Sequence, residues 1–217
     1  MTLVQTRVTS PVVVLGAAMR GSPCTVHGYT ERPHRLPMTR WADPADARDR
    51  ALLHRCRGPV LDIGCGPGRM SEHLAHSGVA VLGIDVVPEA VAQTRARGAS
   101  ALHRDVFDAV PGEGRWACAL LADGNIGIGG DPVTLLSRVA RLLRAGGRVV
   151  ADVAPPGAGL ATYRLVLECG TLRSDPFPWT VVGAEAVGGV ASGAGLRLDA
   201  LHETGGRWYA VLAKELC

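Results

Sequence analysis

The apolar positions of the chain fall into short runs separated by helical repeats. Four mostly apolar runs predict strands buried on both faces, at 60–63, 79–84, 116–122 and 148–153, and residues 100–104 are expected to form a further strand. Three segments between them have apolar residues at helical spacing, at 70–75, 88–97 and 132–143. Continuous apolar runs are typical of parallel strands, which are covered on both sides. The alternation of strand and helix therefore predicts an α/β fold with a doubly wound, mostly parallel sheet.

The pattern changes after the Pro-Pro-Gly sequence at 155–157. Residues 162–169 alternate as a strand does, and residues 181–194 indicate a weak, glycine-rich helix. The runs at 196–202 and 207–213 flank two glycines and predict a C-terminal antiparallel hairpin. With this hairpin we expect a seven-stranded sheet.

The N-terminal part of the chain is the least regular. Glycines and prolines interrupt any period before residue 40, and we expect an irregular arm with one short helical piece near 16–19. Asp43 and Pro44 then predict a helix start, with Asp43 as the N-cap. The expected division is an N-terminal arm or lid at 1–42 and a main domain at 43–217. Partial disorder of the arm and docking of a partner subunit are the alternatives.

Three glycines at alternate positions follow the first strand, at Gly64, Gly66 and Gly68. Glycine is needed where the backbone takes a positive φ or where a ligand approaches closely. This density predicts a ligand-binding turn, and a tight connection without a ligand is the alternative. The dinucleotide fingerprint G-x-G-x-x-G would need a glycine at Arg69, so the spacing disfavours a nicotinamide cofactor.

The sequence from Val60 to Gly68, V-L-D-I-G-C-G-P-G, resembles the first motif of class I S-adenosylmethionine (SAM)-dependent methyltransferases. The resemblance implies their Rossmann-like fold, in which the last strand lies between the fifth and the sixth. It also implies SAM as the cofactor and S-adenosylhomocysteine (SAH) as the product. The implied cofactor-binding residues are Asp62, Gly64, Cys65, Gly66, Gly68, Arg69, Asp85, Val86, Asp105, Val106, Ala122 and Asp123.

Carboxylates follow the second and third strands. Asp85 lies about 20 residues after the first glycine, where a carboxylate can accept both ribose hydroxyls. A helix-capping role is its alternative. The resemblance assigns Asp105 to the adenine amino group and the Val106 amide to the ring, although Asp108 lies close enough to take the role of Asp105.

The resemblance places the methionine part of SAM on the glycine turn and its amino group at the backbone of Ala122 and Asp123. Arg40 or Arg69 is a candidate for its carboxylate, and either is equally consistent with a surface charge.

Methyl transfer from a sulfonium is an in-line displacement, so the protein must mainly hold a nucleophile on axis and exclude water. The loop after the fourth strand makes Asp123 and Asn125 the candidate catalytic, substrate-facing residues. This loop lacks the [D/N]-P-P-[Y/F] signature of enzymes that methylate amino groups of bases or glutamine. Further conceivable pocket residues are His27, Tyr29, Trp41, Glu168 and His202.

Composition excludes several other classes. The net charge is only +3 with no run of Lys or Arg, which argues against a nucleic-acid partner. The six cysteines form no C-x-x-C pair, so neither a metal site nor a disulfide framework is indicated. Neither a secretory signal nor a membrane span is apparent, which predicts a cytoplasmic protein without membrane contact. We expect a monomer or a homodimer.

Three functions remain open from the sequence. A methyltransferase acting on an O, N or C nucleophile of a small molecule is the first. A nicotinamide-dependent Rossmann oxidoreductase is the second, disfavoured by Arg69 and by the C-terminal hairpin. A SAM-binding protein without transferase activity is the third.

Overall fold

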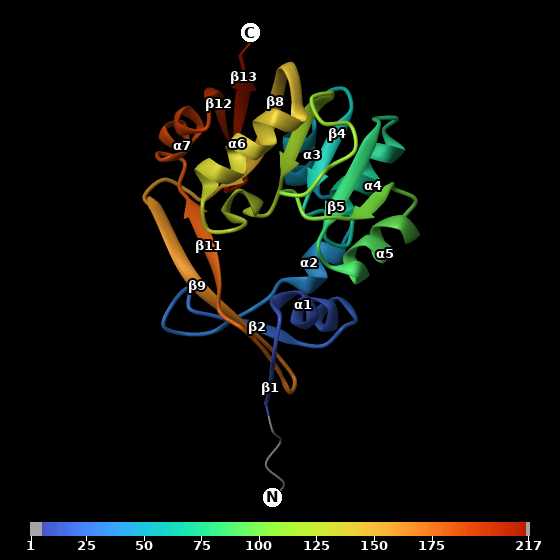
Figure 1. Cartoon of the computed structure of the whole chain (residues 1–217), viewed down its shortest axis with the longest axis vertical. Helices are drawn as coiled ribbons and strands as arrows, with labels where there is room; N and C mark the ends of the chain where they lie inside the picture. The colour runs from blue at the N-terminus through green and yellow to red at the C-terminus, as the bar shows by residue number, and fades with distance from the viewer. Residues whose placement is uncertain (1–5, 216–217) are drawn as a thin grey trace, which may run out of the picture.

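The computed structural model describes residues 6–215, which form two layers (Figure 1). The larger layer is a seven-stranded sheet flanked by helices. Its strands run in the order β12 (Leu196–Thr204), β13 (Arg207–Lys214), β8 (Leu143–Val153), β7 (Trp116–Leu121), β4 (Val60–Ile63), β5 (Val81–Asp85) and β6 (Ala101–His103). The five strands from β8 to β6 are parallel, and β13 is antiparallel to both β8 and β12. The predicted fold class is confirmed, including the last strand between the fifth and sixth.

Helices cover both faces of this sheet. They are α3 (Ala47–Leu53), α4 (Arg69–His76), α5 (Pro88–Ala96), α6 (Pro132–Leu142) and α7 (Val187–Gly193). Alternate residues of β7 point to opposite sides, so Ala119 and Leu121 pack with α6 while Cys118 and Leu120 pack with α3 and α4. Burial on both faces explains the unbroken apolar runs of the central strands.

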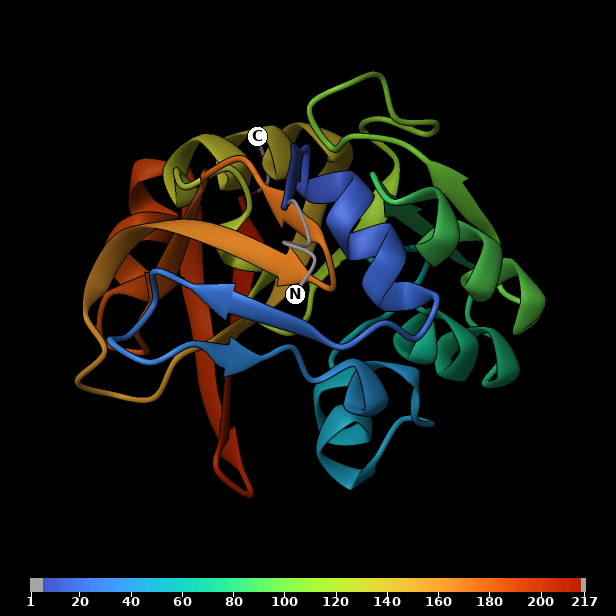
Figure 2. The ribbon, with the colours of Figure 1, turned by 90° about the horizontal axis from the view of Figure 1, so that it is seen from below.

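The second layer is a smaller, six-stranded sheet that packs with α1 (Pro11–Met19). Its strands are β1 (Arg7–Thr9), β10 (Leu172–Ser174), β9 (Leu160–Cys169), β2 (Cys24–His27) and β3 (His34–Arg35), with β11 (Phe177–Val182) paired to β9. Seen from below, α1, β2, β3 and β9 lie in front of the larger sheet (Figure 2). Strands from both ends of the chain therefore build one layer.

The structure corrects two expectations for the N-terminal part. The irregular arm is wrong for the described residues, because they form α1, β2, β3 and α2 (Met38–Ala42). Asp43 follows α2 and does not cap the next helix. Asp46 caps α3 instead, accepting from the Asp49 N–H at 2.8 Å, while the Asp49 carboxylate accepts from the Asp46 N–H at 3.0 Å. The division at residue 42 and the lid role stay predictions.

The helix expected at 181–194 is also partly wrong. Residues 177–182 form β11, paired antiparallel with β9 from Phe177 opposite Leu165 to Val182 opposite Leu160, and α7 begins only at Val187.

Membrane-spanning helices and metal-binding clusters are two features for which the described residues were searched. Across residues 6–215, no helix is long and apolar enough to cross a membrane. The same residues include no group of His, Cys, Asp or Glu arranged to hold a metal ion.

Candidate functional site

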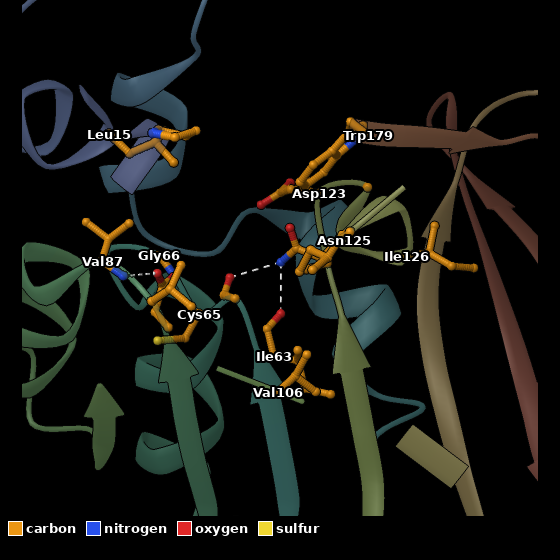
Figure 3. Close-up of a pocket in the computed structure, with 18 of the residues that line it drawn as sticks. Leu15, Ile63, Cys65, Gly66, Val87, Val106, Asp123, Asn125, Ile126 and Trp179 are labelled. Atoms are coloured by element: carbon orange, nitrogen blue, oxygen red, sulfur yellow. Dashed lines mark hydrogen bonds between the residues drawn. The ribbon is translucent and has the colours of Figure 1, made fainter. Parts of the chain in front are cut away.

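A cavity of about 840 Å³ lies between the two layers. One wall, which we call the floor, is formed by the carboxyl ends of β4, β5, β6, β7 and β8 and the residues that follow them. The opposite wall, the roof, consists of the lining residues from α1 to α2 and from β9 and β11. In Figure 3, Leu15 and Trp179 lie on the roof side, across from Ile63, Cys65 and Asn125. Ligands of open α/β sheets bind at this edge.

The three glycines of the turn all have a positive φ, but an added Cβ would meet different surroundings at each. At Gly64 (φ 70°) a Cβ would lie 2.6 Å from Asn125 Nδ2, and at Gly68 (φ 93°) it would lie 2.6 Å from Thr94 Oγ1. At Gly66 (φ 54°) a Cβ would meet nothing within 4 Å. Gly66 also lines the cavity. Steric contacts within the protein therefore require Gly64 and Gly68, whereas Gly66 offers bare backbone to the cavity.

Asp85 ends β5 and closes the same turn. Its carboxylate accepts from the Gly66 N–H at 2.9 Å and from the Val87 N–H at 2.8 Å, one bond on each oxygen. The residue is only 9% exposed, and burial raises the pKa of its carboxyl group above the ordinary value. A carboxylate has about four lone-pair positions, so both oxygens retain capacity toward the cavity.

Residues after β6 form the next part of the floor. Asp105 Oδ1 accepts from the Phe107 N–H at 2.9 Å, which holds the loop in an Asx-type turn. Val106 is buried, and its carbonyl accepts from Arg138 Nε at 2.9 Å. Asp105 and Val106 both line the cavity, as does the exposed Val86 after β5, whereas Asp108 lies outside its lining.

Two predicted site residues support the turn from beneath. Asp62 is 1% exposed and accepts from Ser71 Oγ at 2.7 Å, and burial raises the pKa of its carboxyl group to about 7. Cys65 is buried beside Thr94, and burial raises the pKa of its thiol, which disfavours the thiolate. These residues shape the strand and the turn, although both contribute to the cavity lining.

Arg69 is buried in an ion-pair network. Its Nε lies 3.1 Å from Asp49 Oδ2, and its NH2 donates to Asp123 Oδ1 at 2.8 Å. Arg207 pairs with Asp49 and with Asp152, donating from Nε to Asp152 Oδ1 at 2.7 Å. Burial opposes ionisation of Asp49, but the Asp46 N–H and the two arginines outweigh it and lower the pKa of Asp49. The Arg69 side chain is thus committed to carboxylates of the protein itself.

Asp123, which follows β7, has an unusual backbone conformation. Its φ is 53°, the one positive value outside glycine among residues 6–215. The Asp123 N–H donates to Asp152 Oδ2 at 2.5 Å, which helps to fix this conformation. Its side chain keeps 28% of its surface exposed and lines the cavity. Burial and the neighbouring Asp152 raise the pKa of Asp123, although Arg69 and Arg207 act in the opposite sense.

Asn125 holds the loop after β7 against the glycine turn. Its Nδ2 donates to the carbonyls of Ile63 and Gly64, both at 2.9 Å (Figure 3). The side-chain N–H groups of Asn125 therefore donate to backbone carbonyls of the floor. Ala122, which precedes this loop, is buried and lines the cavity.

The other sequence candidates divide into two groups. Tyr29 and Trp41 line the roof of the cavity. His27, Glu168 and His202 do not belong to its lining. Glu168 instead pairs with Arg173 at 2.7 Å, and the His202 ring packs against Tyr209. Arg40 also lies outside the lining and pairs with Asp46 at 2.8 Å.

Sequence reasoning missed the ion-pair partners and most of the roof. Asp49, Asp152 and Arg207 carry no motif, and only their burial reveals them. On the roof, the run Phe-Pro-Trp-Thr-Val-Val at 177–182 is a strand-like signal that Pro176 and Pro178 obscured.

Comparison with known proteins agrees with this architecture. Residues 60–147 match a family model described as "Methyltransferase domain". The ubiquinone biosynthesis O-methyltransferases of Xylella fastidiosa and Cereibacter sphaeroides are 33% identical over 106 residues and 30% identical over 135 residues. These matches cover 42% and 59% of this chain but only 39% and 47% of the two relatives. The chain thus spans less than half the length of these curated relatives.

Solved structures share the fold over more of the chain. A SAM-dependent methyltransferase from Bacteroides fragilis in complex with SAH superposes with a TM-score of 0.77, at 19% identity and 94% coverage of both chains. The 1,6-didemethyltoxoflavin-N1-methyltransferase of Burkholderia thailandensis gives 0.59, at 19% identity and 79% coverage of this chain and 78% of its own. The fold is therefore that of the class I methyltransferases. The family model thus matches the segment that includes the glycine turn, and the whole described chain has the fold of these methyltransferase structures.

Proposed function

We propose that this protein transfers the methyl group of SAM to an O, N or C nucleophile of a small molecule. The observation that carries the proposal is the floor itself, where bare backbone at Gly66 and the buried carboxylate of Asp85 adjoin one large cavity. Ligand pockets commonly measure roughly 300–1,000 Å³, so this cavity is large enough for a cofactor with a small acceptor beside it.

The floor fits SAM in its polarity and shape. We assign Asp85 to the ribose hydroxyls, because each carboxylate oxygen uses one backbone donor and keeps a lone pair. Gly66 would lie against the methionine part, and the backbone of Ala122 and Asp123 would face its amino group. Asp105, the Val106 amide and Val86 would surround the adenine. Asp62, Gly64, Cys65, Gly68 and Arg69 would hold these groups in place through the contacts described above.

Bound SAM supplies an electrophilic methyl group on a sulfonium. The protein must then orient the acceptor, exclude water and accept a proton where the acceptor loses one. In the balanced reaction the methyl C–S bond breaks with its electron pair going to sulfur, and a bond forms from carbon to the acceptor atom. Asp123 is our candidate proton acceptor because it is a partly exposed cavity carboxylate with a raised pKa. Asn125 would act as a positioning residue.

Calorimetry with SAM, SAH and NADH tests the cofactor assignment on the full chain. We expect SAM and SAH to bind and NADH not to bind. Binding of NADH with no binding of SAM or SAH would contradict the proposal and favour the oxidoreductase alternative.

Mass spectrometry of reactions with phenols, amines and carboxylic acids tests the transfer itself. The expected result is at least one product heavier by a methyl group, formed only with SAM. Tight SAH binding without any methylated product would favour the non-catalytic alternative. We further expect a small-molecule acceptor and no nucleic-acid partner, with a monomeric or homodimeric cytoplasmic protein.

A further inference from the structure

Aromatic side chains gather at the cavity. Phe, Trp and Tyr together make up only 4% of the chain, yet five of them line this one cavity. Phe107 belongs to the floor, next to Asp105. The other four belong to the roof and are Tyr29, Trp41, Phe177 and Trp179. Aromatic rings bury large areas and pair with other rings at centroid separations of about 4.5–7 Å, so the roof favours a planar ligand.

Charge is confined to the opposite wall. Among the described lining residues, those of the roof include no Asp, Glu, Lys, Arg or His. The charged lining residues all come from the floor and are Asp62, Arg69, Asp85, Arg104, Asp105, Asp123 and Asp152. Burying an ionised group without a partner is costly. A carboxylate or phosphate on the acceptor would find no cation on the roof and an excess of carboxylates on the floor.

Several contacts join the roof to the rest of the protein. On one side, Thr180 Oγ1 donates to the Gly130 carbonyl at 2.7 Å, and the backbone of Trp179 forms an isolated antiparallel β-bridge with that of Ile128. A Cβ on Gly127 would lie 2.9 Å from Trp179 Nε1, so glycine at this position lets the indole approach closely. On the other side, Gln93 Nε2 of α5 donates to the Met19 carbonyl of α1 at 2.7 Å. The roof is thus a pre-formed apolar surface.

From these observations we propose that the methyl acceptor is an aromatic molecule without an anionic group. Its ring lies against the roof at Trp179 and Phe177, and its nucleophilic atom faces Asp123 across the cavity. In the view of Figure 3, the Trp179 indole of the roof and the Asp123 carboxylate of the floor lie toward the same end of the cavity, which is consistent with this orientation. This inference rests on the proposed methyltransferase function and narrows its substrate class.

Calorimetry with three probes tests the inference on the full chain, with and without saturating SAH. The probes are 2-naphthol, its carboxylated analogue 6-hydroxy-2-naphthoate, and the cationic sugar glucosamine. We expect 2-naphthol to bind at least tenfold more tightly than either of the others. Equal or tighter binding of a charged probe, or no binding of 2-naphthol, overturns the inference. If the protein does not bind SAH, the proposed function is contradicted. The comparison of the three probes without SAH still tests the acceptor class in that case.

Substitutions in the roof test where 2-naphthol binds. Trp179→Leu should weaken 2-naphthol binding at least tenfold and leave SAH binding within twofold. Trp116→Leu is the matched control, because the Trp116 indole donates to the Pro111 carbonyl outside the cavity lining. Phe177→Leu provides a second roof variant if Trp179→Leu does not fold, as judged by thermal unfolding. Unchanged 2-naphthol affinity in a folded roof variant would overturn the assignment of the ring to the roof.

Discussion

The floor and the roof of the cavity have opposite chemistry. The floor carries buried charges, each held by a named partner, such as Asp85 by two backbone amides and Arg69 by Asp49 and Asp123. The roof lining within the described chain carries no charged side chain and concentrates aromatic rings. A polar wall of fixed geometry suits one constant ligand, whereas an apolar wall selects by shape and by the absence of charge.

This difference separates the effects of mutation. Changes in the floor should alter folding or cofactor binding, and changes in the roof should alter acceptor binding while SAH affinity stays constant.

The largest effect is expected at Asp49, the centre of the ion-pair network beneath the floor. Asp49 is 1% exposed and pairs with Arg40, Arg69 and Arg207. Because Asp49→Asn removes the buried carboxylate that Arg69 and Arg207 share, it should lower the unfolding free energy by about 3–5 kcal/mol. Urea unfolding measures this change. The exposed Asp199, paired with Arg197 at 3.0 Å, is the control, and Asp199→Asn should cost less than about 1 kcal/mol. A similar effect of both variants would contradict the structural role of the network.

The next effect concerns the pH dependence of stability through Asp62. Burial raises the pKa of this carboxyl group from 3.8 to about 7 in the folded protein. The unfolded chain releases the proton at lower pH, so the Asp62 contribution to stability is greatest below about pH 4 and is lost as the pH rises to about 7.

Asp62→Asn removes this titration and keeps an acceptor for Ser71 Oγ. The variant should be more stable than the wild type at pH 8 by as much as about 4 kcal/mol, with a smaller difference at pH 4. Denaturant unfolding across this range measures it. An identical pH profile for the two proteins would show that Asp62 does not titrate in this window.

A smaller loss of stability is expected on substitution of Gly68, the last glycine of the turn. Gly68→Ala combines a positive φ with collision against Thr94 and should lower the unfolding free energy by roughly 3 kcal/mol. Gly78 is the matched control, because its φ is 75° and a Cβ there meets nothing within 4 Å. Gly78→Ala should cost only about 1 kcal/mol, for backbone strain alone. Thermal unfolding of both variants isolates the collision, and equal losses would exclude it.

The smallest effect is expected at the fastening of the roof. Thr180 is 1% exposed and donates to the Gly130 carbonyl. Thr180→Val should lower stability by about 1–2 kcal/mol through the lost hydrogen bond. SAH affinity, measured by calorimetry on the same sample, should stay within twofold of the wild type. A roof variant that weakened SAH binding as strongly as a floor variant would remove the distinction between the two walls.

The sequence predicted the larger sheet and the floor because their signals are local. The motif from Val60 to Gly68 is contiguous, Asp85 ends the next strand, and the hairpin surrounds a glycine pair. Each signal depends on residues a few positions apart, where backbone geometry and strand periodicity act directly.

The network and the roof were missed because they depend on contacts between distant positions. Arg207 reaches Asp49 across 158 positions, and β2 pairs with β9 from the other end of the chain. Arg69 was predicted at the cofactor and lines the cavity, but its pairing with Asp49 and Asp123 was not predicted. Tertiary packing of this kind leaves no periodic pattern in the sequence. It also stabilises the helices and strands of the N-terminal segment, whose glycines and prolines interrupt the local sequence pattern.

The central claim is that the carboxylate at the end of β5 holds the cofactor, and SAH titration of Asp85→Ala beside the wild type tests it most directly. Hydrogen bonds to a charged group contribute about 1.5–3 kcal/mol, so the variant should bind SAH roughly tenfold to a hundredfold more weakly. Thermal unfolding under the same conditions verifies that the variant remains folded. Binding of SAH by wild-type protein with this loss in the variant is the predicted result. Equal affinity of the two folded proteins would contradict the account.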